Sequence, residues 1–195
     1  MSDRGQVAGR PDTSRVFFAL WPDDVAREKL HLESRHLQRQ LGGKATRPDT
    51  LHLTLVFVGD VENGLIDTLK LAASQVEASA FAADFDQVCC WRHNHIAYRA
   101  MSRSPDALLE LVSSLEKNLA AARIPFDARP YKPHITLVRK ADCARLTILE
   151  NGLGGANENP ASEPIRWLAR DFVLVKSSLR AEGARYEQLG RWPLL

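Results

Sequence analysis

The tetrapeptide His-apolar-Thr-apolar occurs twice in this chain, once starting at His52 and once at His134. With near-average composition, two copies in one chain of this length would arise by chance on roughly one occasion in a thousand. In a strand, alternate side chains share a face, so His52 lies beside Thr54 and His134 lies beside Thr136. The leucine and isoleucine between them would then face a core. Each His–Thr pair therefore points towards a cleft or towards solvent.

Two imidazoles facing one cleft can serve as the base and the acid of a single step, because an ordinary histidine titrates near neutral pH. The hydroxyls of Thr54 and Thr136 can donate hydrogen bonds to a bound oxyanion. Two histidines and two threonines thus form a cradle for a tetrahedral phosphate, and the motifs contain no carboxylate set for Mg²⁺ or Mn²⁺. We expect in-line displacement at phosphorus, without a metal or a cofactor and with a bell-shaped pH profile. The residues alone do not decide which histidine is the acid.

Two residues near the second motif are candidate substrate contacts. Arg139 could bind phosphate through its planar guanidinium, but it lies five residues after His134, and strict alternation places it on the opposite face. Only a bulge or the end of the strand would redirect it. Phe57 occupies the corresponding place after the first motif and is expected on the core face. Tyr131 could stack on a base, or it could be a turn aromatic packed between prolines.

A local basic rim for an RNA backbone is a further hypothesis, against which scattered surface charge is the alternative. Its candidate members are Lys44, Arg47, Arg92, Arg99 and Lys132.

Composition bounds the class of protein. The chain has 195 residues, with 26 Lys and Arg against 24 Asp and Glu, so the net charge of +2 argues neither for nor against a nucleic-acid partner. No apolar run approaches the ~18 residues of a membrane span. Three cysteines without metal-ligand spacing favour a reduced, cytoplasmic chain in which they are small buried hydrophobes. Residues 1–14 are expected to be a disordered leader and residues 15–195 a single, monomeric domain.

Apolar patterns predict helices and strands in alternation. Helices are expected from Asp23 as N-cap to about Gln40, from about Glu62 to Ala78, and from Ser104-Pro105 to about Ala122. Strands are expected over residues 15–21, 51–58, 81–91, 95–100, 134–139, 171–179 and 184–192, with a hairpin turn at His93-Asn94 and a loop over 151–160.

The order of these elements favours an α+β fold with antiparallel sheets, because hairpins are present and no glycine-rich loop follows the first strand. A strand-helix-strand unit ends in a His-x-Thr strand twice, over residues 15–58 and 95–138. The repeat suggests two lobes related by a pseudo-twofold axis, each contributing one motif to a shared cleft.

These segments also resemble a known family. The resemblance lies in Arg-Val-Phe-Phe-Ala-Leu-Trp-Pro at 15–22, Leu-His-Leu-Thr-Leu at 51–55 with Val-Gly at 58–59, Arg-Pro-Tyr-Lys-Pro-His-Ile-Thr-Leu at 129–137 with Arg139, and Gly-Ala-Arg-Tyr at 183–186 with Arg-Trp-Pro-Leu at 191–194. From Arg15 onward the chain is similar to the 2H phosphoesterase superfamily. Within that superfamily it is similar to the LigT-like RNA 2′,3′-cyclic phosphodiesterases of the 2′-5′ RNA ligase family.

The resemblance implies a bilobal fold in which two antiparallel sheets form a V-shaped central cleft with helices outside. It implies a hydrolase that opens the 2′,3′-cyclic phosphate of an RNA end, or of a small cyclic nucleotide, to a 2′-phosphomonoester. In such enzymes the residue matching His52 donates a proton to the departing 3′ oxygen, and the residue matching His134 activates water. Some members also join RNA through a 2′-5′ linkage.

Three other hypotheses stay open. The same fold could act on another cyclic or 2′-5′ phosphodiester, or it could be a non-catalytic module that binds RNA ends. A plain α+β domain without cleft chemistry would place His52 and His134 far apart.

Overall fold

The computed structural model describes residues 12–150, 163–181 and 183–195, with side chains left aside at 147–150. The strands are β1 (Thr13–Leu20), β2 (Lys44–Ala45), β3 (Leu53–Glu62), β4 (Phe81–Phe85), β5 (Gln87–Trp91), β6 (Ile96–Ala100), β7 (His134–Arg139), β8 (Ile165–Ala169), β9 (Asp171–Arg180) and β10 (Gly183–Pro193). The helices are α1 (Asp24–Leu41), α2 (Ile66–Ser74), α3 (Asp106–Ala121) and α4 (Cys143–Glu150), with short 3₁₀ turns η1 (Pro48–Thr50) and η2 (Asn63–Leu65).

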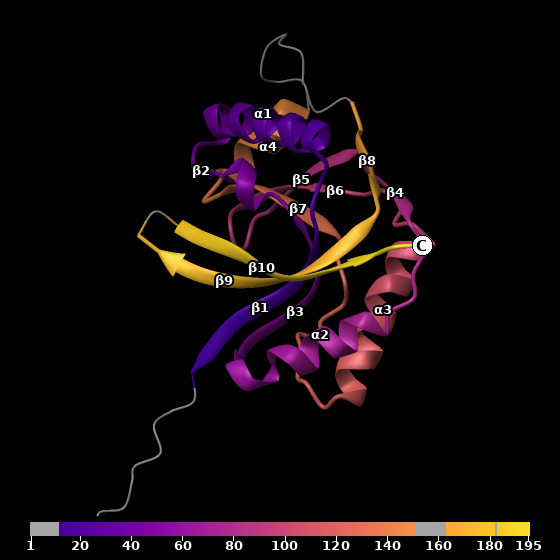
Figure 1. Cartoon of the computed structure of the whole chain (residues 1–195). Coiled ribbons are helices and arrows are strands. Elements are labelled where there is room, and N and C mark those ends of the chain that lie inside the picture. Colours follow the sequence, from indigo (N-terminus) through magenta and orange to yellow (C-terminus); the bar gives the residue numbers. More distant parts are fainter. Residues whose placement is uncertain (1–11, 151–162, 182) are drawn as a thin grey trace, which may run out of the picture.

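Two four-stranded sheets organise the molecule, in the orders β10-β9-β1-β3 and β2-β7-β6-β5, and β4 pairs with β8 in a separate ribbon. Every pair is antiparallel, which confirms the predicted α+β class. Each four-stranded sheet contains one motif strand. Helices α1 and α4 pack beside the sheet of β7, whereas α2 and α3 lie together beside β3 (Figure 1).

Local sequence signals determine where helix α1 begins and ends. The Asp23 carboxylate accepts a hydrogen bond from the Ala26 amide at 2.8 Å, as the predicted N-cap should. The helix ends at Gly42, whose φ of 69° favours glycine. Its buried stripe begins at Ala26 and continues through Leu30. Val25 is 68% exposed, because it points about 100° away from Ala26 around the helix.

Several predicted bounds are corrected. Helix α2 is shorter than expected at both ends, because its predicted first turn is the 3₁₀ turn η2, where Leu65 is exposed, and the helix ends at Ser74 rather than Ala78. The single strand predicted over 81–91 is two strands with different partners, β4 with β8 and β5 with β6. Helix α3 begins at Asp106, with Pro105 as its N-cap, one residue after the predicted start. Strand β1 begins at Thr13, two residues before the predicted start.

Three elements were not predicted: β2, β8 and α4. Strands β2 and β8 pair with strands at least 80 residues away in sequence, β7 and β4 respectively, so no pattern nearby in the sequence marks them. The loop predicted over 151–160 and most of the expected leader lie outside the described residues.

The expectation of three reduced cysteines is wrong. Cys90 in β5 and Cys143 at the start of α4 form a disulfide across 53 residues, with their Cα atoms 5.6 Å apart. Only the tertiary fold brings these two elements together, so spacing could not reveal the bond. The inference from cysteine usage to a cytoplasmic location therefore loses its basis. No helix in the described part of the chain is long and apolar enough to cross a membrane.

Candidate active site

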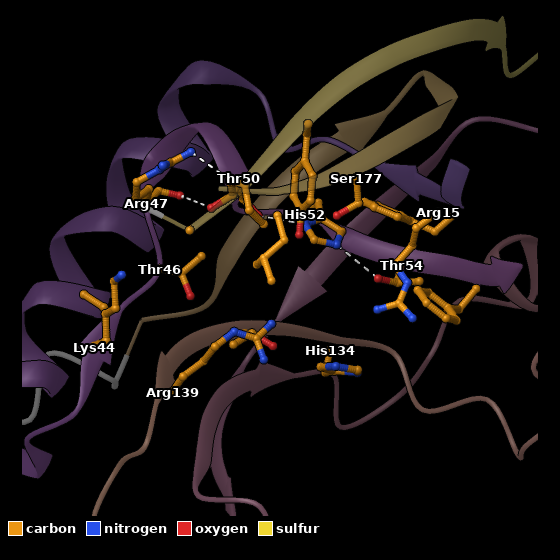
Figure 2. Close-up of a pocket in the computed structure, with 18 residues that line it drawn as sticks. Arg15, Lys44, Thr46, Arg47, Thr50, His52, Thr54, His134, Arg139 and Ser177 are labelled. Atoms are coloured by element: carbon orange, nitrogen blue, oxygen red, sulfur yellow. Dashed lines mark hydrogen bonds between the residues drawn. The ribbon is translucent and has the colours of Figure 1, made fainter. Parts of the chain in front are cut away.

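A cavity of about 620 Å³ opens between the two four-stranded sheets and is lined by both motifs. Figure 2 shows His52 at one wall, just before β3, and His134 at the opposite wall, at the start of β7. Thr54 and Thr136 also line the cavity. The structure therefore brings together all four motif residues, and the alternative in which the two histidines lie far apart is wrong.

A β-bulge occurs at the same place in each motif strand. The register of β3 with β1 skips Leu55, and the register of β7 with β6 skips Leu137. An extra residue shifts the alternation by one position, so the residue two places later returns to the face of the histidine. Arg139 consequently lines the cavity, because the bulge turns its side chain to the same face as His134. Phe57 also lines the cavity, so its expected place on the core face is wrong.

Both histidines are oriented by the carbonyl two residues before them. Nδ1 of His52 lies 2.7 Å from the oxygen of Thr50, and Nδ1 of His134 lies 2.8 Å from the oxygen of Lys132. A carbonyl can only accept, so Nδ1 carries the proton in each ring and Nε2 is the nitrogen that exchanges one. Nε2 of His52 lies 3.1 Å from the hydroxyl of Thr54.

Aromatic rings surround His52. Trp21 stacks on the imidazole with centroids 5.5 Å apart, Phe17 lies at 4.9 Å, and Tyr186 approaches edge-on at 5.3 Å. This burial lowers the pKa of His52 to about 4. The hydrogen bond to Thr50 opposes the shift, whereas the positive charges of His134 and Arg139 add to it.

The second histidine has a similar setting. The rings of Trp91 and Tyr98 lie edge-on to His134 at 4.6 and 5.7 Å. Burial lowers the pKa of His134, and the positive charge of Arg139 lowers it further, against the hydrogen bond to Lys132. The lowered pKa values therefore favour the neutral form of both rings at neutral pH. The ring that serves as the acid must gain its proton together with a bound anion, whose charge raises the pKa.

The cavity is built for an anion. Its described lining includes Arg15, Lys44, Arg47 and Arg139 and no acidic residue. A concave wall with charges of one sign raises the local concentration of the opposite charge, although the net charge of the chain is only +2. Within the described residues, no group of three or more His, Cys, Asp or Glu side chains is arranged to hold a metal ion.

The predicted basic rim is correct only in part. Lys44 and Arg47 line the cavity, whereas Arg92 and Lys132 are not among its lining residues. Arg99 is wrongly placed in the rim, because it is 1% exposed and pairs with Glu33 of α1 at 2.6 Å.

Tyr131 does not line the cavity, which removes the support for its role as a substrate contact. Its hydroxyl donates to the carbonyl of Thr54 at 3.2 Å, and burial raises its pKa. The packed-aromatic interpretation is the one that fits. Polar cavity residues that were not among the site candidates include Arg15, Thr46, Thr50, Ser177 and Tyr186. Arg15 and Tyr186 at least lie in segments that resemble the family, whereas no sequence pattern marks Ser177.

The family model of the 2′-5′ RNA ligase superfamily matches residues 21–180. An RNA 2′,3′-cyclic phosphodiesterase of Escherichia coli K12 is 28% identical over 184 residues, covering 94% of this chain and 98% of that protein. One from Archaeoglobus fulgidus is 34% identical over 179 residues, covering 90% and 97%.

Solved structures agree with the sequence relatives. The crystal structure of E. coli LigT complexed with 3′-AMP superposes with a TM-score of 0.78 at 27% identity, covering 94% of this chain and 99% of that one. The structure of TT0787 from Thermus thermophilus has the same fold, with a TM-score of 0.69 at 24% identity, covering 92% of this chain and 97% of that one.

Proposed function

The chain belongs to the 2′-5′ RNA ligase superfamily, and we propose that it is an RNA 2′,3′-cyclic phosphodiesterase. One observation carries the proposal. The two motif histidines face one cavity lined by cations. In each ring Nδ1 donates to a backbone carbonyl, which leaves Nε2 available for proton transfer. Relatives that cover nearly the whole chain are phosphodiesterases of RNA 2′,3′-cyclic ends.

In the proposed reaction the hydroxyls of Thr54 and Thr136 donate to the non-bridging oxygens of the cyclic phosphate, and Arg139 neutralises its charge. Nε2 of His134 takes a proton from water as the water oxygen attacks phosphorus in line. The bond from phosphorus to the 3′ oxygen breaks, and that oxygen takes the proton from Nε2 of His52. The product is a 2′-phosphomonoester. The division between acid and base follows the family resemblance.

The cycle needs a protonated His52 and a neutral His134 at the start. Burial lowers the pKa of His52 to about 4, so at neutral pH it must be protonated as the substrate anion binds. Proton uptake and phosphate binding are then coupled. After turnover His52 is neutral and His134 carries the proton, and exchange with solvent restores both.

The test is turnover of a short RNA ending in a 2′,3′-cyclic phosphate, in excess EDTA, by the parent and by His52→Ala and His134→Ala. We expect opening to a 2′-phosphate by the parent and a loss of at least about a hundredfold in each variant, since each proton transfer contributes that much. Replacing His93, an exposed turn histidine, by Ala is the matched control. Opening to a 3′-phosphate, or activity retained in either cavity variant, would contradict the mechanism.

We also propose 2′-5′ joining as a secondary activity of the same site. The 5′ hydroxyl of a second RNA would take the place of water, lose its proton to His134 and displace the same 3′ oxygen. Other cyclic or 2′-5′ phosphodiesters share this chemistry, and competition against the RNA end would rank them. A monomer suffices, because residues of one chain form the described cavity. A cytoplasmic location stays a prediction.

A further inference from the structure

The cavity extends well beyond the motif residues. Its volume of about 620 Å³ is in the range of sites that hold whole ligands, and a single phosphate needs far less. In Figure 2, Lys44, Thr46 and Arg47 lie on one side of His52, and Arg15 lies on the other. Lys44 lies in β2 and Thr46 directly follows that strand. The proposed mechanism uses neither residue.

Two cations lie directly opposite one another at this end. Lys44 of β2 pairs in register with Arg139 of β7, and both line the cavity. Like charges directly across a strand pair destabilise a sheet. Among the described residues no carboxylate forms an ion pair with either of them. An anion between Lys44 and Arg139 would turn this repulsion into attraction.

A polar group without a partner lies beside the two cations. The amide of Thr46 donates to the carbonyl of Leu137 at 2.8 Å, which ties Thr46 to the bulge of β7. Its hydroxyl oxygen is buried without a hydrogen-bond partner in the described structure, and the residue lines the cavity. A buried hydroxyl without a partner costs free energy, so this one is suited to a bound acceptor. Arg47 already forms an ion pair with Asp49 at 2.8 Å and donates a hydrogen bond to the carbonyl of Ala184.

We propose that Lys44 and Thr46 form a second phosphate subsite beside Arg139, which binds the phosphodiester on the 5′ side of the terminal nucleotide. The inference rests on the proposed function, because it takes the cyclic phosphate to lie between the two histidines. The next phosphate of the same strand is then the nearest further anion along the cavity. The site accordingly selects RNA ends over cyclic mononucleotides.

The experiment compares kcat/KM for three substrates: a cyclic mononucleotide, a dinucleotide with the same cyclic end, and that dinucleotide with a neutral methylphosphonate at the internal linkage. The parent should prefer the charged dinucleotide over both others by about tenfold, as a charged hydrogen bond contributes. In Lys44→Ala the ratio of charged dinucleotide to mononucleotide should fall by most of that factor. Thr46→Val should lower it by about threefold.

Lys117→Ala is the matched control, because it removes the same charge from an exposed position on α3 and should keep the parent's ratio. Salt provides a second readout. For the charged dinucleotide, the slope of log(kcat/KM) against log salt concentration should decrease by about 0.7 in Lys44→Ala, the value for one contact with a single strand.

Equal losses on all three substrates in Lys44→Ala, or no preference of the parent for the charged linkage, would overturn the subsite while leaving the proposed function intact. If the parent opens none of the three, the proposed function fails. Binding of the 2′-phosphate products then tests the subsite separately. Tighter binding of the charged dinucleotide product than of the mononucleotide product, lost in Lys44→Ala, supports it, and equal binding refutes it. Tighter binding of a separate RNA strand with a 5′-phosphate than of the same strand with a 5′-hydroxyl, lost in Lys44→Ala, would assign the subsite to a second strand. That result would overturn the assignment made above.

Discussion

The carbonyl two residues before each candidate catalytic histidine sets the chemistry of the ring. It accepts from Nδ1, so that Nε2 faces the cavity, and it requires only local backbone geometry. The same contact therefore recurs wherever the motif forms a strand start. The surroundings then separate the two rings, since His52 is enclosed by three aromatic side chains and His134 by two.

The pKa of His52 predicts an acid-sensitive fold. Its folded pKa of about 4 lies below the ordinary 6.5, so its contribution to stability is complete above about pH 6.5 and is lost progressively as the pH falls from 6.5 to about 4. At pH 4.5 the loss should be about 2 kcal/mol. His52→Gln should show a smaller decrease in the free energy of unfolding between pH 7 and 4.5, measured with urea. His93→Gln is the control, and an identical decrease in the parent and His52→Gln would refute the assignment.

Arg139 provides a test of the bulge and of phosphate binding together. Arg139→Ala should lower kcat/KM for the cyclic end by about a hundredfold, and Arg139→Lys by about tenfold, because a lysine keeps the charge but not the planar pair of donors. Steady-state kinetics with a cyclic mononucleotide measures both. Exposed Arg103, which does not line the cavity, gives the control Arg103→Ala. A loss no greater than that of the control would mean that Arg139 does not touch the reacting phosphate.

At the scale of elements, the bulges at Leu55 and Leu137 decide which side chains enter the cavity. Without them Phe57 and Arg139 would face away from the histidines. The bulges occupy equivalent positions, so the backbone keeps the symmetry of the repeat. The side chains break it, with an aromatic ring on one wall and a guanidinium on the other.

A buried ion pair joins α1 to the second sheet. Arg99 of β6 donates to both carboxylate oxygens of Glu33, and burial is the main cause that raises the pKa of that carboxyl. Glu33→Gln should decrease the free energy of unfolding by about 3 kcal/mol, because it leaves the Arg99 charge buried without its counterion. Urea unfolding at pH 7 measures this. Glu28→Gln, on the exposed face of α1, is the control, and a change as small as that of the control would contradict the prediction.

At the scale of the whole molecule, the two lobes must come from one chain if the monomer proposal is right. An equimolar mixture of His52→Ala and His134→Ala should then stay as inactive as either variant alone. If the cavity were shared between exchanged lobes of two chains, mixing and refolding would restore a measurable part of the parent's activity. Sedimentation of the parent at assay concentration is the companion measurement, and a dimer would contradict the proposal.

The sequence by itself determined the features that depend on neighbours along the chain. The alternation of His52 with Thr54 and of His134 with Thr136, the cap at Asp23 and the antiparallel α+β class follow from side-chain period, turn chemistry and the duplicated motif. The alternation and the cap were predicted correctly because each is decided within a few residues, and the class because the order of the local patterns shows hairpins and interleaved helices.

Only the tertiary structure decided the features that depend on a partner distant in sequence. The bulge that turns Arg139 into the cavity arises from register with β6, and the burial of Arg99 arises from α1. The bond between Cys90 and Cys143 and the low pKa of His52 likewise come from groups that meet only in the fold. Strand register, burial and cross-links are cooperative properties of packed elements, so a local pattern can state which residues carry the chemistry but not how the fold tunes them.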